Sequence, residues 1–204
     1  MTRRYPASLG LGAFLVLAAT LFFWVSAFSV PYIKSLSYLH SDGNGVKYGN
    51  FGWCKTDNSL CFKHDGYAWH PEFIGGKHTT GALIFVALTA AFGTLAWLSI
   101  LHSIYNLSSG FLSAFLTGLT ALCATISFFI VVVVFGVAHH RFKHEGLSPH
   151  YGGAFPLVIV GWLVYLIALP LIIIGWIRER HYRREIVATE GVTTTEITHK
   201  RRWF

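Results

Sequence analysis

The chain has 204 residues, of which 53% are hydrophobic and only 12% are charged, and its mean hydropathy is +0.52. This composition excludes an ordinary water-soluble globular protein. The arginines behind the formal net charge of +7 gather near the two ends of the chain, so we interpret the charge as a signal of membrane topology and find no case for a nucleic-acid partner.

Four stretches of the chain contain no charged residue, namely 8–30, 79–101, 111–138 and 154–177. They have 23, 23, 28 and 24 residues, and a helix needs roughly 20 apolar residues to cross the hydrocarbon core of a bilayer. In lipid, a helix satisfies its own backbone hydrogen bonds. We therefore predict an all-α membrane protein, in which four transmembrane helices form a bundle in the lipid bilayer.

The first stretch also resembles a secretory signal, because Arg3 and Arg4 precede it and Val25-Ser26-Ala27 lies near its end. Its apolar run is longer than the roughly 7–15 residues of a signal sequence, which favours a retained helix. Cleavage would leave three spans, and the sequence alone leaves this alternative open.

The placement of arginine orients the bundle. Arg3 and Arg4 precede the first helix and six arginines follow the fourth, so the positive-inside rule puts both termini in the cytoplasm of a plasma-membrane protein. The remaining segments are then a cytoplasmic N-terminus (1–7), two extracellular loops (31–78 and 139–153), a cytoplasmic turn (102–110) and a basic cytoplasmic tail (178–204). The tail residues that we expect to contact anionic lipids, at about 1 kcal/mol each, are Arg178, Arg180, Arg183 and Arg184.

The first extracellular loop can form a small β-hairpin domain. A strong turn signal at 42–45 precedes a predicted strand at 46–54, and 61–63 is the predicted returning strand. Cys54 and Cys61 lie on the oxidising side of the membrane at a spacing that suits a closed hairpin, so we predict a disulfide worth roughly 2.5 kcal/mol. Free thiols or a zinc site are the alternatives, although the tight paired spacing of zinc ligands is missing.

The same loop carries a glycine–aromatic–cysteine step in Gly52-Trp53-Cys54, a second cysteine at Cys61, and Gly66-Tyr67 shortly afterwards. With four spans and cytoplasmic termini, this motif resembles the claudin-like tetraspans, and above all their fungal branch, the PalI-type pH-response proteins and the eisosomal Sur-type proteins. The resemblance implies a plasma-membrane protein that stabilises or localises a pH-response receptor complex or an eisosome-type domain. The Gly-Leu-Trp form of animal claudins is absent, and the tail is shorter than in many PalI-type proteins.

Histidine is unusually frequent in the loops, and four candidates for a pH response lie in or beside the second one: His139, His140, His144 and His150. Imidazole titrates close to neutral pH, which supports a pH-responsive surface. A metal site and a merely structural role at the polar membrane boundary are the alternatives. The sequence lacks the acidic outer shell that a metal site usually has, so we predict no metal and no cofactor.

No catalytic arrangement is recognisable in the sequence, and the centres of the spans carry no charged residue that could relay protons. Small residues such as Ala114 and Gly118 allow close helix contact, either within the bundle or in a homo-oligomer. We therefore predict a non-enzymatic accessory or organising protein with a membrane-protein partner. An auxiliary subunit of a channel or transporter, and a structural protein for cell-wall integrity or cell fusion, are the alternatives.

Overall fold

The computed structural model describes residues 7–42, 45–57, 59–63, 81–106 and 110–200. Its helices are α1 (Ala7–Ala27), α3 (Ile84–Asn106), α4 (Gly110–His144) and α5 (Ala154–Lys200). Each contains a segment long and apolar enough to cross a membrane: Leu9–Ala27, Ile84–Ile104, Gly110–His144 and Ala154–Arg178. The prediction of a multi-pass protein with four apolar helices is therefore confirmed.

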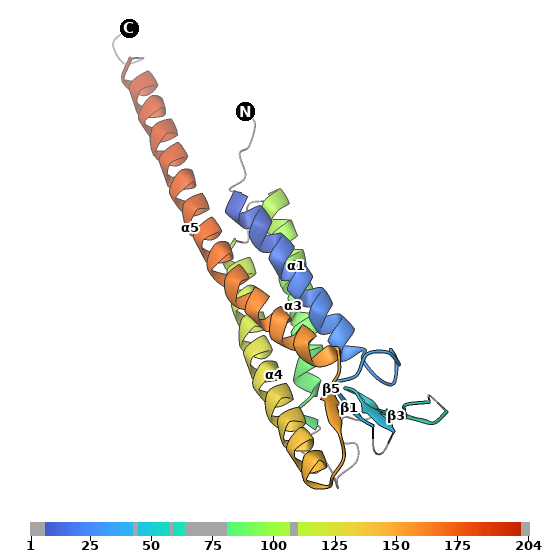
Figure 1. The fold of residues 1–204 in the computed structure, drawn as a ribbon. Helices are drawn as coiled ribbons and strands as arrows, with labels where there is room; N and C mark the ends of the chain where they lie inside the picture. The colour runs from blue at the N-terminus through green and yellow to red at the C-terminus, as the bar shows by residue number, and fades with distance from the viewer. Residues whose placement is uncertain (1–6, 43–44, 58, 64–80, 107–109, 201–204) are drawn as a thin grey trace.

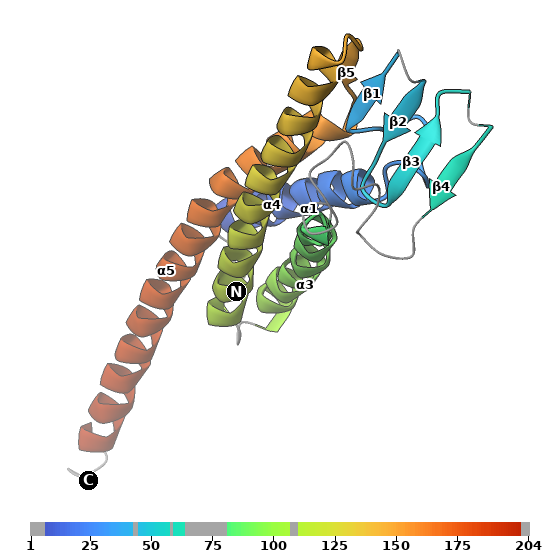
Figure 2. The ribbon, with the colours of Figure 1, turned by 90° about the horizontal axis from the view of Figure 1, so that it is seen from below.

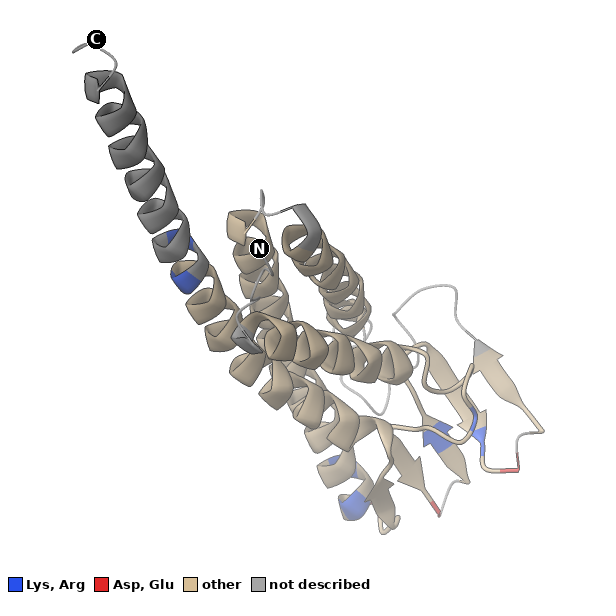
Figure 3. Cartoon of the chain, turned by 90° about the horizontal axis from the view of Figure 1, so that it is seen from above, with Lys and Arg blue, Asp and Glu red and all other residues tan. Residues whose placement is uncertain are grey.

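The four helices pack as a closed ring, in which α1 contacts α3 and α5, and α4 contacts the same two helices. Large apolar side chains such as Phe14, Leu122 and Ile167 are exposed on the outside of this ring, which is the side that faces lipid in a membrane. The described charged residues lie toward the two ends of the bundle (Figure 3), as an apolar solvent around its middle requires.

Each pair of neighbouring helices in the ring is joined by a hydrogen bond between side chains. Hydroxyl and indole groups inside a membrane bundle act in this way, at about 0.6 kcal/mol per bond on average. The bonds are Thr20–Tyr165 between α1 and α5 (2.8 Å), Trp24–Thr94 between α1 and α3 (3.0 Å), Thr89–Ser127 between α3 and α4 (2.9 Å) and Trp162–Thr125 between α5 and α4 (3.1 Å).

A five-stranded antiparallel sheet covers one end of the bundle, and the start of α1 and the end of α5 lie toward the opposite end (Figures 1 and 2). Its strands are β1 (Leu39–Ser41), β2 (Val46–Tyr48), β3 (Gly52–Lys55), β4 (Cys61–Lys63) and β5 (Pro149–Tyr151), in the order β4-β3-β2-β1-β5. The predicted two-stranded hairpin is thus part of a larger unit, because β5 from the second loop pairs with β1 from the first. Three or more strands that share a hydrophobic face have the stability that an isolated two-stranded hairpin lacks.

Several predicted boundaries shift in the structure. The strand expected at 46–54 is interrupted by a turn at 49–51 and becomes β2 and β3. Helix α3 continues through the first residues of the predicted turn 102–110, and α4 continues six residues into the predicted loop 139–153. Helix α5 runs to Lys200, into the segment predicted as the basic cytoplasmic tail (178–204), because arginine and glutamate after Ile177 are polar and still favour helix. The absence of charged residues therefore predicted where the apolar spans lie, but it did not predict where the helices end.

Candidate functional site

The sheet brings both loops together and is the candidate functional site. Residues directly opposite one another on neighbouring strands point to the same face of a sheet. The register places one polar row across the strands, which consists of His150, His40, Lys47, Cys54 and Cys61. The alternate row consists of Tyr151, Leu39, Tyr48, Trp53 and Phe62, and it is almost entirely aromatic.

The aromatic row fixes the sheet on the end of α4. The ring of Tyr48 stacks on Phe142 at 5.6 Å, and Tyr38, next to β1, stacks on Phe135 at 4.7 Å. Burial, with a smaller contribution from the Glu145 carboxylate, raises the pKa of Tyr48 to about 12, so its hydroxyl stays protonated at physiological pH. Since Phe135 and Phe142 are two turns apart on α4, the sheet is held at two points along one helix.

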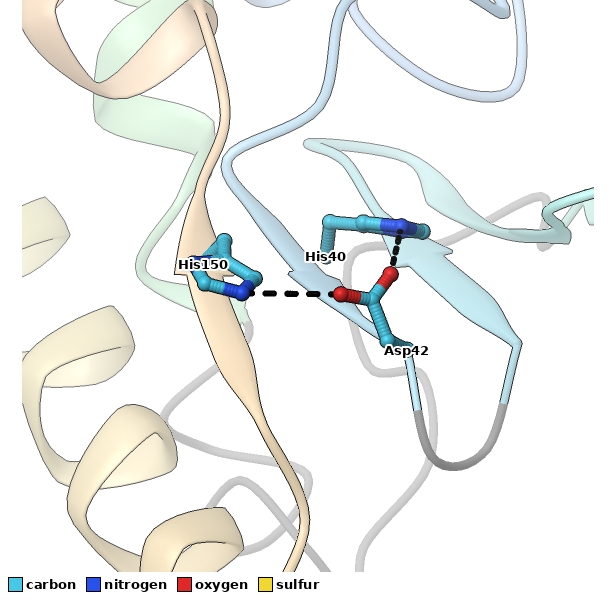
Figure 4. Close-up of polar contacts among 3 residues, drawn as sticks. All are labelled: His40, Asp42 and His150. Carbon is cyan, nitrogen blue, oxygen red and sulfur yellow. Dashed lines mark ion pairs between the residues drawn. The ribbon is translucent and has the colours of Figure 1, made fainter.

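An acidic group and two imidazoles meet where β1 and β5 pair (Figure 4). The Nε2 atom of His40 lies 2.7 Å from Oδ1 of Asp42, and Nε2 of His150 lies 3.5 Å from Oδ2 of the same carboxylate. His40 and His150 are opposite each other in the register, and Asp42 follows His40 by two residues, so all three side chains share one face. One carboxylate therefore bridges the two loops.

The exposure of the three side chains differs. That of His40 is 23% exposed, whereas those of Asp42 and His150 are 58% and 68% exposed. The Nδ1 atom of His40 is buried and has no hydrogen-bond partner among the described residues, so within them this ring lacks the outer hydrogen bond that orients a metal-binding imidazole. Within the described residues, no group of three or more His, Cys, Asp or Glu side chains is arranged to hold a metal ion. The Asp42 carboxylate and the two imidazoles of His40 and His150 can hold the two loops together electrostatically. We call this group of three residues the clasp.

The four histidines singled out from the sequence do not form one cluster. His139 stacks on Tyr151 with ring centroids 4.7 Å apart, and His140 meets His144 edge-on at 4.8 Å. Of these four, only His150 forms an ion pair with a carboxylate among the described residues, and its partner is Asp42. Sequence reasoning missed His40 and Asp42 as its partners, because it read 42–45 as a turn without the short strand at 39–41. The available signal for this strand was the spacing of His40 and Asp42, which are two residues apart and so lie on one face of a strand.

Cys54 and Cys61 form the predicted disulfide, with an S–S distance of 2.06 Å, and they are opposite each other on β3 and β4. Cys54 is fully buried, and Trp53 stacks on Phe62 at 5.9 Å. In the turn between the two strands, Ser59 donates its backbone N–H and its hydroxyl to the Asp57 carboxylate, which lowers the pKa of Asp57. The disulfide thus closes a turn that is also stabilised by the hydrogen bonds between Ser59 and Asp57. Gly66 and Tyr67 of the sequence motif lie outside the described residues.

The basic segment after the fourth span is helical. Arg178 and Arg180 are exposed, and the guanidinium of Arg180 lies 4.1 Å from the centroid of the Trp176 ring. A cation over an indole at this boundary suits the layer between lipid and water. Arg183 and Arg184 also belong to α5, but their side chains lie outside the described part of the structure.

The glycines of the helices differ in the space around them. A Cβ added at Gly118 would meet nothing within 4 Å, so the Ala114/Gly118 pair does not mark a tight contact of this helix inside the bundle. At Gly93 of α3, in contrast, a Cβ would lie 2.1 Å from the Tyr165 hydroxyl and 2.6 Å from Oγ1 of Thr20. Gly93 therefore provides the space in which the hydrogen bond between α1 and α5 is made.

Comparison with known families gives a match over more than half of the chain. The family model described as "DuoxA: Dual oxidase maturation factor" matches residues 58–188, which are 131 of the 204 residues. The matched range contains α3, α4, β5 and the apolar part of α5. A search of the curated proteins found no match. The comparison gives no support to the fungal claudin-like branch that the loop motif resembled, although the small sheet with its disulfide on four apolar helices agrees with the expected architecture.

Proposed function

The chain belongs to the dual oxidase maturation factor family, and on that premise we propose that it is a membrane accessory protein that binds a dual oxidase and supports the maturation of that enzyme. The description of the family as a maturation factor favours a non-enzymatic role, in which the protein acts through contacts with its partner. A membrane-protein partner was also the interpretation of the sequence.

One structural observation carries the mode of action. The two loops form a single sheet that is pinned to α4 by ring stacking and clasped by Asp42, so one end of the bundle carries a preorganised domain. Preorganised surfaces bind with a smaller entropic cost than loops that must order on contact. We propose that the partner contacts this domain together with the lipid-facing sides of the helices.

The orientation and location follow as part of the same proposal. The disulfide lies at the sheet end of the bundle, and disulfides form in compartments outside the reducing cytosol. The start of α1 and the end of α5 lie toward the other end, where the exposed Arg178 and Arg180 follow the last apolar segment. We therefore place the sheet outside the cell and both termini in the cytoplasm of a plasma-membrane protein.

Two finer roles were inferred from the sequence, namely a pH-response or eisosomal partner and a pH-responsive set of histidines. A pH-response receptor complex or an eisosome-type domain as partner finds no support in the matched family. A pH-responsive role among the four histidines is best argued for His150, because its imidazole faces the Asp42 carboxylate across the strand pair. We retain that role for His150 as a proposal about the clasp between the loops.

The test is co-expression of the tagged chain with a dual oxidase in cells that lack other maturation factors. We expect the oxidase to co-purify with the chain from mild detergent and its amount at the cell surface to rise several-fold. A variant with Cys54→Ser and Cys61→Ser should lose this effect, whereas Cys123→Ser, which alters a buried free cysteine of α4, should retain it. Failure of the unmodified chain to capture the oxidase or to change its surface level would contradict the proposed function.

A further inference from the structure

A short loop at the end of α1 carries exposed apolar side chains directly beyond the last turn of that helix. It comprises residues 28–36, between α1 and β1, and Figure 1 shows it projecting sideways from the bundle as a blue turn. Phe28, Tyr32 and Ile33 are 42%, 49% and 37% exposed, and Lys34 beside them is exposed as well. We call this segment the 28–36 loop.

The 28–36 loop is rigidly built. The backbone N–H of Val30 donates to the Leu36 carbonyl at 2.9 Å, and that of Ile33 donates to the Phe28 carbonyl at 3.1 Å. The turn between β2 and β3 holds it from the other side, because the N–H of Asn50 donates to Oγ of Ser29 at 3.0 Å. Backbone groups that are bonded within the loop can enter an apolar layer without the cost of unsatisfied polar atoms.

The exposed apolar side chains continue a surface that already faces lipid. The apolar segment of α1 ends at Ala27, so Phe28 is the next residue beyond the hydrocarbon-spanning part. Aromatic rings run without a break from the helix to the sheet: Trp24 to Phe28 at 5.4 Å, Phe28 to Tyr32 at 5.8 Å and Tyr32 to Phe51 at 5.5 Å. Aromatic rings at this level are typical of the boundary between acyl chains and headgroups.

We propose that the 28–36 loop is a membrane-surface anchor, with Phe28, Tyr32 and Ile33 inserted in the interfacial layer of the leaflet on the sheet side and the Lys34 amine at the phosphate level. The occupant of this surface is lipid, because its apolar residues continue the outward side of α1 and its one lysine carries a long stem that can reach the headgroups. The anchor fixes the tilt of the sheet relative to the membrane. It goes beyond the proposed function and does not depend on the identity of the partner.

The test measures the depth of the loop in the bilayer with no partner protein present. The full chain carrying Cys123→Ser and Ile33→Cys is labelled with a nitroxide at residue 33 and reconstituted in phosphatidylcholine nanodiscs, while Cys54 and Cys61 stay bonded to each other. A matched variant carries the label at Thr56, an exposed residue in the turn between β3 and β4. A third variant labels Tyr32 in place of Ile33 and serves if the first does not fold.

We expect the label at residue 33 or 32 to be more accessible to oxygen than to a water-soluble nickel reagent, and the label at residue 56 to show the reverse. Equal access of the nickel reagent to both positions would overturn the proposal. So would a loop label that is in water in nanodiscs and becomes shielded only when a dual oxidase is added, because the occupant would then be protein. In that last case the proposed function would stand while the anchor would not.

Discussion

Replacement of Gly93 by alanine tests how the bundle is packed. Gly93 lies in α3 where the hydroxyls of Thr20 and Tyr165 meet at 2.8 Å, and an added Cβ would lie 2.1 Å from the Tyr165 hydroxyl. Ordinary contact begins at 3.4 Å, so the methyl group and the hydroxyl must separate by more than 1 Å. Tyr165 is fully buried and its ring packs on Phe23 at 5.8 Å, so it has little room to retreat.

The expected cost follows from three contributions. Overpacking of a close-packed interior costs about 1–3 kcal/mol. Loss of the Thr20–Tyr165 hydrogen bond adds roughly 0.6 kcal/mol, the average for such bonds in membrane bundles. Alanine favours helix over glycine by up to about 1 kcal/mol, which acts in the opposite direction. We therefore expect Gly93→Ala to destabilise the bundle by about 0.6–2.6 kcal/mol.

Thermal unfolding of the purified chain in detergent, followed by tryptophan fluorescence, measures the effect. Gly118→Ala in α4 is the matched control, because its Cβ would meet nothing within 4 Å, and we expect its Tm to equal or exceed that of the unmodified chain. Tyr165→Phe removes the atom nearest to the new methyl group, so Gly93→Ala should cost less in that background. Equal Tm values for the two glycine variants, or strictly additive effects of Gly93→Ala and Tyr165→Phe, would refute the packing argument.

Three further predictions concern the sheet and the topology. Asp42→Asn should weaken the clasp by about 0.5–1 kcal/mol and speed amide exchange in β5. The control, Asp57→Asn in the turn between β3 and β4, should leave amide exchange in β5 unchanged. Unaltered exchange in β5 after Asp42→Asn would contradict the clasp. Cys54→Ser should lower the unfolding free energy by roughly 2.5 kcal/mol, because it removes the disulfide. Recovery of both Cys54 and Cys61 as alkylatable thiols from the unreduced protein would show that the disulfide does not form. Tags at both chain ends should resist protease on intact cells while a tag inserted at Asp57 is cleaved, and cleavage of the C-terminal tag would reverse the orientation.

The helices could be predicted from the sequence because a single physical requirement defines them. A span must be apolar over roughly 20 residues, and the charge-free stretches show this directly. Outside the apolar layer that requirement ends, so the sequence did not indicate that α4 continues to His144 or α5 to Lys200. Helix ends in water depend on capping and propensity, whose signals are individually small.

The sheet was only partly predictable, because most of its strands have three residues. The disulfide and the β3–β4 hairpin have local signals in Cys54, Cys61 and the polar turn between them. Pairing of β1 with β5 joins segments more than 100 residues apart, and no local pattern encodes it. The Asp42 clasp depends on that pairing, since His150 reaches the carboxylate only when β5 lies beside β1.

The contacts also show that the folded unit is larger than the matched family range. The match begins at residue 58, yet α1 packs against α5 and α3, and β1 supplies the strand to which β5 is paired. Without residues before 58, β5 would be a lone strand and α5 would lose one of its two helix neighbours. Isolated strands and open bundles in lipid leave backbone and hydroxyl groups without partners. The first loop and α1 must therefore be present for the matched segment to adopt the arrangement that it has in this structure.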